Sequence, residues 1–286
     1  MSPSPRDHDR PVTTNRAETV VTGVAMTPVM RHLVAAVVIA AVAAAAGCSR
    51  TADRSAPSPS LSAGAGCAAS RGSNVTTRRG ELQMLVHLPP CYDEHTETRY
   101  PLIVLIHGAG ADQTQWTDIG TTTELDRLVG VGEIAPAIVV MPSFGDASAA
   151  DEARAVVDRV VPRIDATYRT LADPEHRAIG GISRGGGAAL LAGSAHPELF
   201  GVVGAHSPAV SGDLDQIRDE LSALGGNIRL DVGESDGLRA SIVRFVDSLE
   251  RAGTSVELHV EPGHHNRAYW RRHVADYLRF YAARWR

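Results

Sequence analysis

The residues with the clearest chemical potential are the five at 181–185, which read Gly-Ile-Ser-Arg-Gly. They end an apolar run at 177–182 and open a small-residue segment at 185–195. We therefore expect Ser183 on a sharp turn from a strand into a helix. Glycine is needed two positions before and after the serine, because side chains there would collide with the neighbouring strand and helix. At a helix start, backbone N–H groups also favour developing negative charge. The pattern predicts that Ser183 is a nucleophile, although a tight turn without catalysis can carry the same residues.

A serine hydroxyl is a weak nucleophile and needs a general base held by a carboxylate. Acidic residues follow the apolar run at 228–232, at the carboxyl end of an expected strand. Asp236 is our candidate acid, because it lies in the loop beyond the strand whereas Asp231 lies within it. Glu234 is the alternative.

Candidate bases follow the last expected strand, at 256–260. His264 and His265 stand there side by side, and either one can reach the same edge of a parallel sheet as the serine. His273 falls inside the final helix, where we expect an exposed or capping side chain. His206 follows another strand, where it can line the pocket or serve as a structural core residue.

Catalysis by acyl transfer also needs two backbone N–H groups that stabilise an oxyanion. One is predicted at Arg184, the residue after the nucleophile. The other is predicted in the glycine-rich loop at 107–111, after the first central strand. Ala109 is the expected donor, with Gly108 as the alternative.

The elements that position these residues alternate between strands and helices. Apolar runs predict strands at 81–88 (an antiparallel edge strand), 101–106, 137–141, 177–182, 202–205, 228–232 and 256–260. Helical periodicity appears at 153–168, with a bend at Pro162, and at 185–195, 239–252 and 268–282. This alternation predicts a single α/β domain with a mostly parallel central sheet covered by helices on both faces.

Composition excludes a nucleic-acid-binding surface. The 286-residue chain has a formal net charge of −5 and a pI near 6.2, whereas nucleic-acid binders are typically basic. Arginines do cluster near the C-terminus, but they alternate with apolar residues at helical spacing, which favours a solvated helix face.

The first part of the chain reads as an export segment. Arg31 and His32 precede a small-apolar run at 33–47, which is short for a transmembrane helix. Cys48 ends the sequence Ala-Ala-Gly-Cys, which resembles the lipobox of bacterial lipoproteins. This resemblance implies that Cys48 becomes the lipidated N-terminus. The alternatives are ordinary cleavage of the signal and retention of the apolar run as a helix. Cys67 and Cys91 would then be available to form a disulfide with each other in an oxidising compartment.

We predict an N-terminal extension and export signal at 1–47, a flexible tether at 48–66 and a catalytic domain at 67–286. The protein is expected on the outer face of the cell membrane or secreted.

Several stretches resemble the esterase family that includes esterase D, feruloyl esterase modules, enterochelin esterases and mycolyltransferases. The similar segments are Leu-Ile-Val-Leu-Ile-His-Gly at 102–108, Val-Pro-Arg-Ile-Asp-Ala-Thr-Tyr-Arg-Thr at 161–170, Gly-Ile-Ser-Arg-Gly-Gly at 181–186 and Pro-Gly-His-His at 262–265. The last resembles the family's Pro-Gly-Gly-His motif, which selects His265 over His264 as the base; Asn266 stands where the family commonly has Asp.

The resemblance implies the α/β-hydrolase fold, a small-molecule ester substrate and hydrolysis through a Ser183–His265–Asp236 triad without metal or cofactor. It does not fix the acyl or alcohol group or the oligomeric state. Two other functions remain open from the sequence: an acyltransferase using the same triad, and a catalytically inactive surface binding protein.

Overall fold

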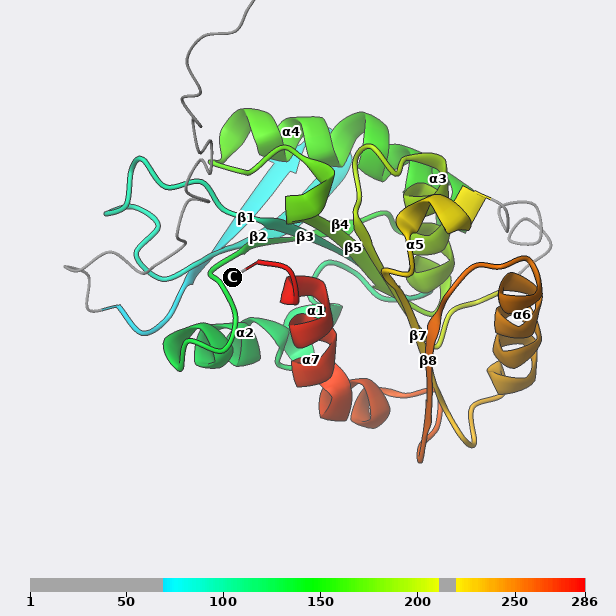
Figure 1. Cartoon of the computed structure of the whole chain (residues 1–286). Helices are drawn as coiled ribbons and strands as arrows, with labels where there is room; N and C mark the ends of the chain where they lie inside the picture. The colour runs from blue at the N-terminus through cyan, green and yellow to red at the C-terminus, as the bar shows by residue number, and fades with distance from the viewer. Residues whose placement is uncertain (1–68, 211–219, 286) are drawn as a thin grey trace, which may run out of the picture. The chain divides into compact units, whose positions relative to one another are not determined.

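Eight strands form one sheet in the order β1-β2-β4-β3-β5-β6-β7-β8 (Figure 1). A computed structural model describes residues 69–210 and 220–285. β1 and β2, and likewise β2 and β4, are antiparallel, and all other neighbouring strands are parallel. The strands are β1 Ser73–Arg79, β2 Leu82–Leu88, β3 Leu102–Ile106, β4 Ile138–Ser143, β5 Arg177–Ile182, β6 Val202–His206, β7 Ile228–Gly233 and β8 Glu257–Glu261.

Helices cover both faces of this sheet (Figure 1). One face carries α3 (Ala149–Ala155), α4 (Val161–Thr167), α5 (Arg184–Ala195) and α6 (Arg239–Arg251). The other carries α1 (Gln115–Asp118), α2 (Thr121–Gly130) and the C-terminal α7 (Arg267–Ala282). Short 3₁₀-helical turns lie at η3 (Pro174–His176) and η5 (Glu220–Leu224). The predicted α/β class and mostly parallel sheet are confirmed.

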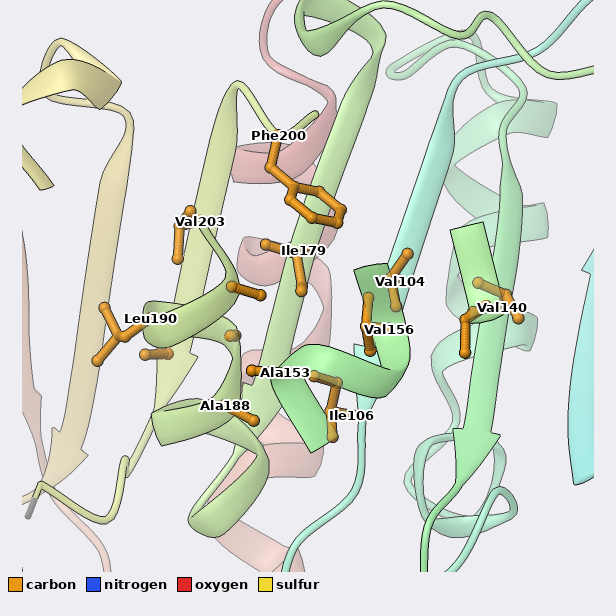
Figure 2. Packing of buried hydrophobic residues seen from close by; sticks show 14 of the residues in the cluster. Val104, Ile106, Val140, Ala153, Val156, Ile179, Ala188, Leu190, Phe200 and Val203 are labelled. Atoms are coloured by element: carbon orange, nitrogen blue, oxygen red, sulfur yellow. The ribbon is translucent and has the colours of Figure 1, made fainter. Parts of the chain in front are cut away.

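The central strands are buried on both sides, as their continuous apolar runs predicted. In β3, Leu102, Val104 and Ile106 face the core under α3 and α5, whereas Ile103 and Leu105 face the core under α7. Successive strand residues point to opposite faces, so one short strand contributes to both cores. Figure 2 shows Val104 and Ile106 packed with side chains from α3, α5 and the neighbouring strands.

The structure corrects the N-terminal edge of the predicted sheet. The strand expected to lie at the edge, β2, is flanked by β4 on one side and by β1 on the other. β1 reads Ser-Asn-Val-Thr-Thr-Arg-Arg and is mostly exposed. It lacks the apolar alternation of a half-buried strand, so the sequence pattern could not reveal it.

The helical segment expected at 153–168 is interrupted rather than bent. α3 is followed by a π-helical segment, η2 (Val156–Val160), and then by α4, whose second residue is Pro162. A proline has no N–H for the helical ladder and its ring crowds the preceding turn. The widened turn before Pro162 accommodates both effects. α1 and α2 were not predicted, because their apolar residues are few.

Candidate active site

Three side chains from separate loops meet at the carboxyl edge of the sheet. The Ser183 hydroxyl Oγ lies 3.0 Å from Nε2 of His265, and Nδ1 of the same ring lies 2.8 Å from Oδ2 of Asp236. The Asp236 side chain is fully buried, whereas one third of the His265 side chain is exposed. The buried carboxylate accepts the Nδ1–H and leaves Nε2 free to accept the serine proton.

The elbow that presents Ser183 is strained and depends on its glycines. Ser183 has φ 55° and ψ −116° between β5 and α5, a conformation rare for a residue with a side chain. A Cβ at Gly181 would lie 2.1 Å from the Gly185 carbonyl oxygen, and one at Gly185 would lie 2.5 Å from the His107 carbonyl oxygen. Only hydrogen fits at either position, which is why the motif needs glycine there.

The loop after β7 holds Asp236 in place with its own backbone. Leu238 N–H donates to Asp236 Oδ1 at 2.8 Å, which leaves Oδ2 for His265. The alternative acid Glu234 and the alternative base His264 are both solvent-exposed. The predicted pair, rather than either alternative, is therefore the one that the structure brings to the serine.

The Trp270 indole lies against the His265 ring. Their ring centroids are 5.1 Å apart with an interplanar angle of 85°, so one ring contacts the other edge to face. Trp270 is buried and its Nε1–H points to Ser207 Oγ at 3.4 Å. The indole limits the rotation of the imidazole.

The glycine-rich loop after β3 lies beside the nucleophile. A Cβ built on Gly108 would lie 3.5 Å from Ser183 Cβ. The N–H of Gly108 donates to Gln115 Oε1 at 2.7 Å, so this group is already engaged. Of the two predicted donors in this loop, the geometry therefore favours Ala109. Gln115 was not identified from the sequence, because nothing in its neighbourhood distinguishes it from a surface glutamine.

His107 fixes the orientation of the peptide that carries the Ala109 N–H. Phe144 N–H donates to His107 Nε2 at 3.1 Å, so the ring carries its proton on Nδ1 and donates it to the Gly108 carbonyl oxygen at 2.8 Å. Burial lowers the pKa of His107, which keeps the ring neutral. Because the peptide is planar and trans, the Ala109 N–H points away from the held carbonyl.

Arg184 follows the nucleophile, and its side chain binds a buried carboxylate. Its Nε–H donates to Glu152 Oε1 at 2.9 Å, and Nη2 lies 2.8 Å from the same oxygen in an ion pair. The Nη2–H donates to the Gly145 carbonyl oxygen at 2.6 Å. The Glu152 side chain is fully buried, and its Oε2 has no hydrogen-bond partner within the part of the chain that the structure describes. Burial raises the pKa of Glu152 to about 7. The positive charge of Arg184 acts to lower this pKa and offsets only part of the rise.

A second His–Asp pair lies beneath the site and is sealed from solvent. His206 Nδ1 contacts Asp231 Oδ2, and Nε2 accepts a hydrogen bond from the Tyr281 hydroxyl at 2.7 Å. His206 is fully buried and stacks on Tyr277. It is therefore a core residue, and the pocket-lining alternative is wrong. Its backbone carbonyl nevertheless accepts the Ser183 N–H at 2.9 Å, so it supports the elbow from below.

The remaining candidates from the sequence are less central. His273 is neither fully exposed nor a cap: its side chain is 17% exposed and lies 3.8 Å from Asp276. Arginines of α7 bind acidic side chains or carbonyl oxygens of neighbouring segments, as Arg267 and Arg271 do at Asp118. These contacts agree with a structural helix face rather than a binding patch.

Cys48 and Cys67 lie outside the described residues, so lipidation and the Cys67–Cys91 pairing stay predictions. The apolar run at 33–47 also lies outside them. Within 69–210 and 220–285, no helix is long and apolar enough to cross a bilayer. The same residues contain no group of three or more His, Cys, Asp or Glu side chains arranged to hold a metal ion.

A mostly parallel sheet with helices on both faces, and a strained serine turn at its carboxyl edge, define an α/β-hydrolase. The chain belongs to the esterase family: the family model described as "Putative esterase" matches residues 75–281. This confirms the resemblance noted in the sequence.

Relatives in sequence and structure agree with this family. An endo-1,4-beta-xylanase/feruloyl esterase from Xylanibacter ruminicola is 31% identical over 209 residues, which are 68% of this chain and 28% of the relative. A ferulic acid esterase structure superposes with a TM-score of 0.68 at 24% identity, covering 75% of this chain and 98% of the other. An S-formylglutathione hydrolase from Staphylococcus aureus has a TM-score of 0.61 at 15% identity, covering 75% of this chain and 98% of the other. The chain spans less than a third of the length of the curated relatives it matches.

Proposed function

We propose that this protein is a serine hydrolase that cleaves carboxylic esters through an acyl-enzyme. The observation that carries the proposal is the continuous hydrogen-bonded chain from Ser183 through His265 to Asp236. It stands at the sheet edge where the esterase family places its chemistry, and membership of that family supports ester substrates.

The reaction proceeds in two steps. His265 Nε2 takes the proton of the Ser183 hydroxyl as Oγ attacks the ester carbonyl carbon. The tetrahedral intermediate then collapses, and the alcohol leaves with the proton from His265. In the second step water gives its proton to His265 and attacks the acyl-enzyme, which releases the carboxylic acid and restores the serine. Asp236 orients the imidazole and stabilises its charged form in both steps.

The oxyanion is stabilised by the backbone N–H groups of Arg184 and Ala109. Gly108 lies beside the Ser183 side chain, so the Ala109 N–H that follows it is within the same small region. The start of α5 adds the field of a helix N-terminus at the same place. Fixed donors of this kind typically contribute several kcal/mol to the transition state, about 3–4 kcal/mol for one donor.

Esters of hydroxycinnamic acids are the first substrates to test. Two similar proteins are described as feruloyl esterases, one of them a Clostridium thermocellum module complexed with sinapinate, at 20% identity and a TM-score of 0.63. For this chain we propose small aromatic or short-chain carboxylic esters.

The decisive experiment measures hydrolysis of a p-nitrophenyl ester and of methyl ferulate by the wild-type protein and by Ser183→Ala. We expect labelling of the wild type by a fluorophosphonate probe, and loss of both labelling and turnover in the variant with its melting temperature retained. Removal of a triad member typically costs about 10⁴-fold or more. Residual activity above about 1% would therefore contradict the proposal.

Glu234→Gln and His264→Asn are matched controls, because they change the two rejected alternatives within the same loops. We expect both to keep near wild-type turnover. Products are analysed with and without an added alcohol. Preferential transfer to the alcohol would identify an acyltransferase instead, and a wild-type protein that is not labelled would favour an inactive binding protein.

We also propose that the enzyme is exported and carried on the outer face of the membrane. The charged flank, the short apolar run at 33–47 and the Ala-Ala-Gly-Cys sequence support this location. Cys48 carries the lipid, residues 48–66 form the tether, and the domain at 67–286 acts outside the cell. In that compartment Cys67 and Cys91 form a disulfide.

A further inference from the structure

The two predicted oxyanion donors are held by one segment, the loop after β4 together with the start of α3. At one end of this segment Phe144 N–H binds His107, whose ring holds the carbonyl of the Gly108–Ala109 peptide. The next residue, Gly145, accepts a hydrogen bond from the Arg184 side chain. Adjacent backbone groups of one loop therefore bind the ring that holds the Ala109 peptide and the side chain of Arg184.

Glu152 makes this attachment rigid. It belongs to α3, and its side chain is completely buried beside Arg184, whose own side chain is only 16% exposed. The guanidinium Nε–H donates to Oε1 and Nη2 lies beside the same oxygen, while Oε2 has no hydrogen-bond partner among the described residues. A buried carboxylate with an unsatisfied oxygen costs stability, so this pair is not explained as an optimised structural ion pair.

We propose that Glu152 is a positioning residue for the proposed esterase reaction: by holding the Arg184 side chain against the loop after β4, it fixes the two oxyanion donors relative to each other. Without Glu152, the guanidinium keeps only the Gly145 carbonyl oxygen as an acceptor, which is a weaker restraint against turning toward Ser183, its neighbour in the chain. The first turn of α5 then loses its attachment to α3. The inference rests on the function proposed above.

The test compares Glu152→Ala with the conservative Glu152→Gln, which keeps an oxygen acceptor for Arg184. The fluorophosphonate titrates the active sites first, so that kcat is expressed per functional site. We expect kcat of Glu152→Ala to fall about 10-fold with little change in KM, because a slightly misplaced donor loses part of the 10²–10³-fold that one donor contributes. Glu152→Gln should recover most of this loss.

A second readout reports on the oxyanion hole itself. A boronic acid that forms a tetrahedral adduct with the serine should bind Glu152→Ala more weakly, by about the same factor as the fall in kcat/KM. Asp165→Ala is the matched control, because it also removes the carboxylate partner of a buried arginine, Arg177, at the opposite end of β5. It should lower stability and leave kcat per site unchanged.

Arg184→Met keeps the backbone N–H and removes the attachment, so it tests the same idea if Glu152→Ala does not fold. We expect a similar fall in kcat, and no further loss when Glu152→Ala is added, because both changes break one interaction. Unchanged kcat per site and unchanged inhibitor affinity in these variants would overturn the inference. That result leaves the proposed function intact, since the latter fails only if Ser183 is neither labelled nor required.

Discussion

At the scale of single residues, the site contains groups that are held in energetically unfavourable states. Ser183 is held in a rare backbone conformation, and Glu152 is a carboxylate without solvent. Such features destabilise a fold by a few kcal/mol each and persist where the surrounding structure enforces them.

The raised pKa of Glu152 has a direct effect on stability. Its pKa is about 7 in the folded protein and 4.5 for a free side chain, chiefly because of burial. Removing the proton from Glu152 therefore requires more free energy in the folded chain than in the unfolded chain. As the pH rises from about 4.5 to about 7, this group makes folding less favourable. Glu152→Gln removes this dependence. The free energy of unfolding of the variant, minus that of the wild type, should rise by about 1–3 kcal/mol between pH 5 and pH 8.

Urea unfolding of the two proteins at both pH values measures this difference. All other titrating groups are common to both chains, so they cancel in the comparison. Parallel stability curves across the range would show that Glu152 is ionised throughout and that Arg184 fully compensates its burial.

At the scale of elements, the position of His265 is set by the start of a helix. His265 directly precedes Asn266, whose side chain accepts the Tyr269 N–H at 3.1 Å and caps α7. The family commonly has Asp at this position, and both side chains can act as N-caps. The cap fixes where α7 begins, and therefore where the preceding imidazole lies.

Asn266→Ala should lower the free energy of unfolding by about 1 kcal/mol, the usual effect of losing an N-cap. It should also reduce kcat per titrated site, because the last fixed point beside His265 is lost. Asn266→Asp retains an oxygen acceptor and should keep both properties near wild type. Chemical denaturation and turnover measured on the three proteins test this. Equal stability of Asn266→Ala and the wild type would contradict a capping role.

The elements also show where sequence patterns succeed. Strands such as β3 and β4 were predicted because they are buried on both faces and so are apolar at every position. β1 was missed because its side chains face solvent, and a strand without a buried face has no apolar period. The π-helical segment before Pro162 was predicted only as a bend, since proline signals a disturbed helix but not its form.

At the scale of the whole molecule, the meeting of Ser183, His265 and Asp236 could be predicted because all three residues follow strand ends at one edge of a parallel sheet. The partners that hold them could not. Glu152 and Arg184 are 32 residues apart in the sequence. A glutamate in an amphipathic helix is expected to be exposed to solvent unless the packing of that helix is known. Gln115 reaches Gly108 from α1 by the same kind of tertiary contact. Such partners depend on packing between elements, which periodicity does not encode.

The location of the enzyme is a property of the entire chain, and Cys48 tests it. If Cys48 is lipidated, the wild-type protein expressed in a bacterial host with a lipoprotein pathway should sediment with membranes and partition into the detergent phase of Triton X-114.

Cys48→Ser removes the thiol of the Ala-Ala-Gly-Cys sequence, so the protein should shift to the soluble exported fraction or remain unprocessed at the inner membrane. Ester hydrolysis per titrated site should stay the same, because we expect the domain at 67–286 to fold without the anchor. Cys67→Ser is the matched control: it removes a thiol that we assign to the disulfide and should leave the membrane fraction unchanged. Equal membrane association of wild type and Cys48→Ser, with the same processed mass, would show that another segment retains the protein.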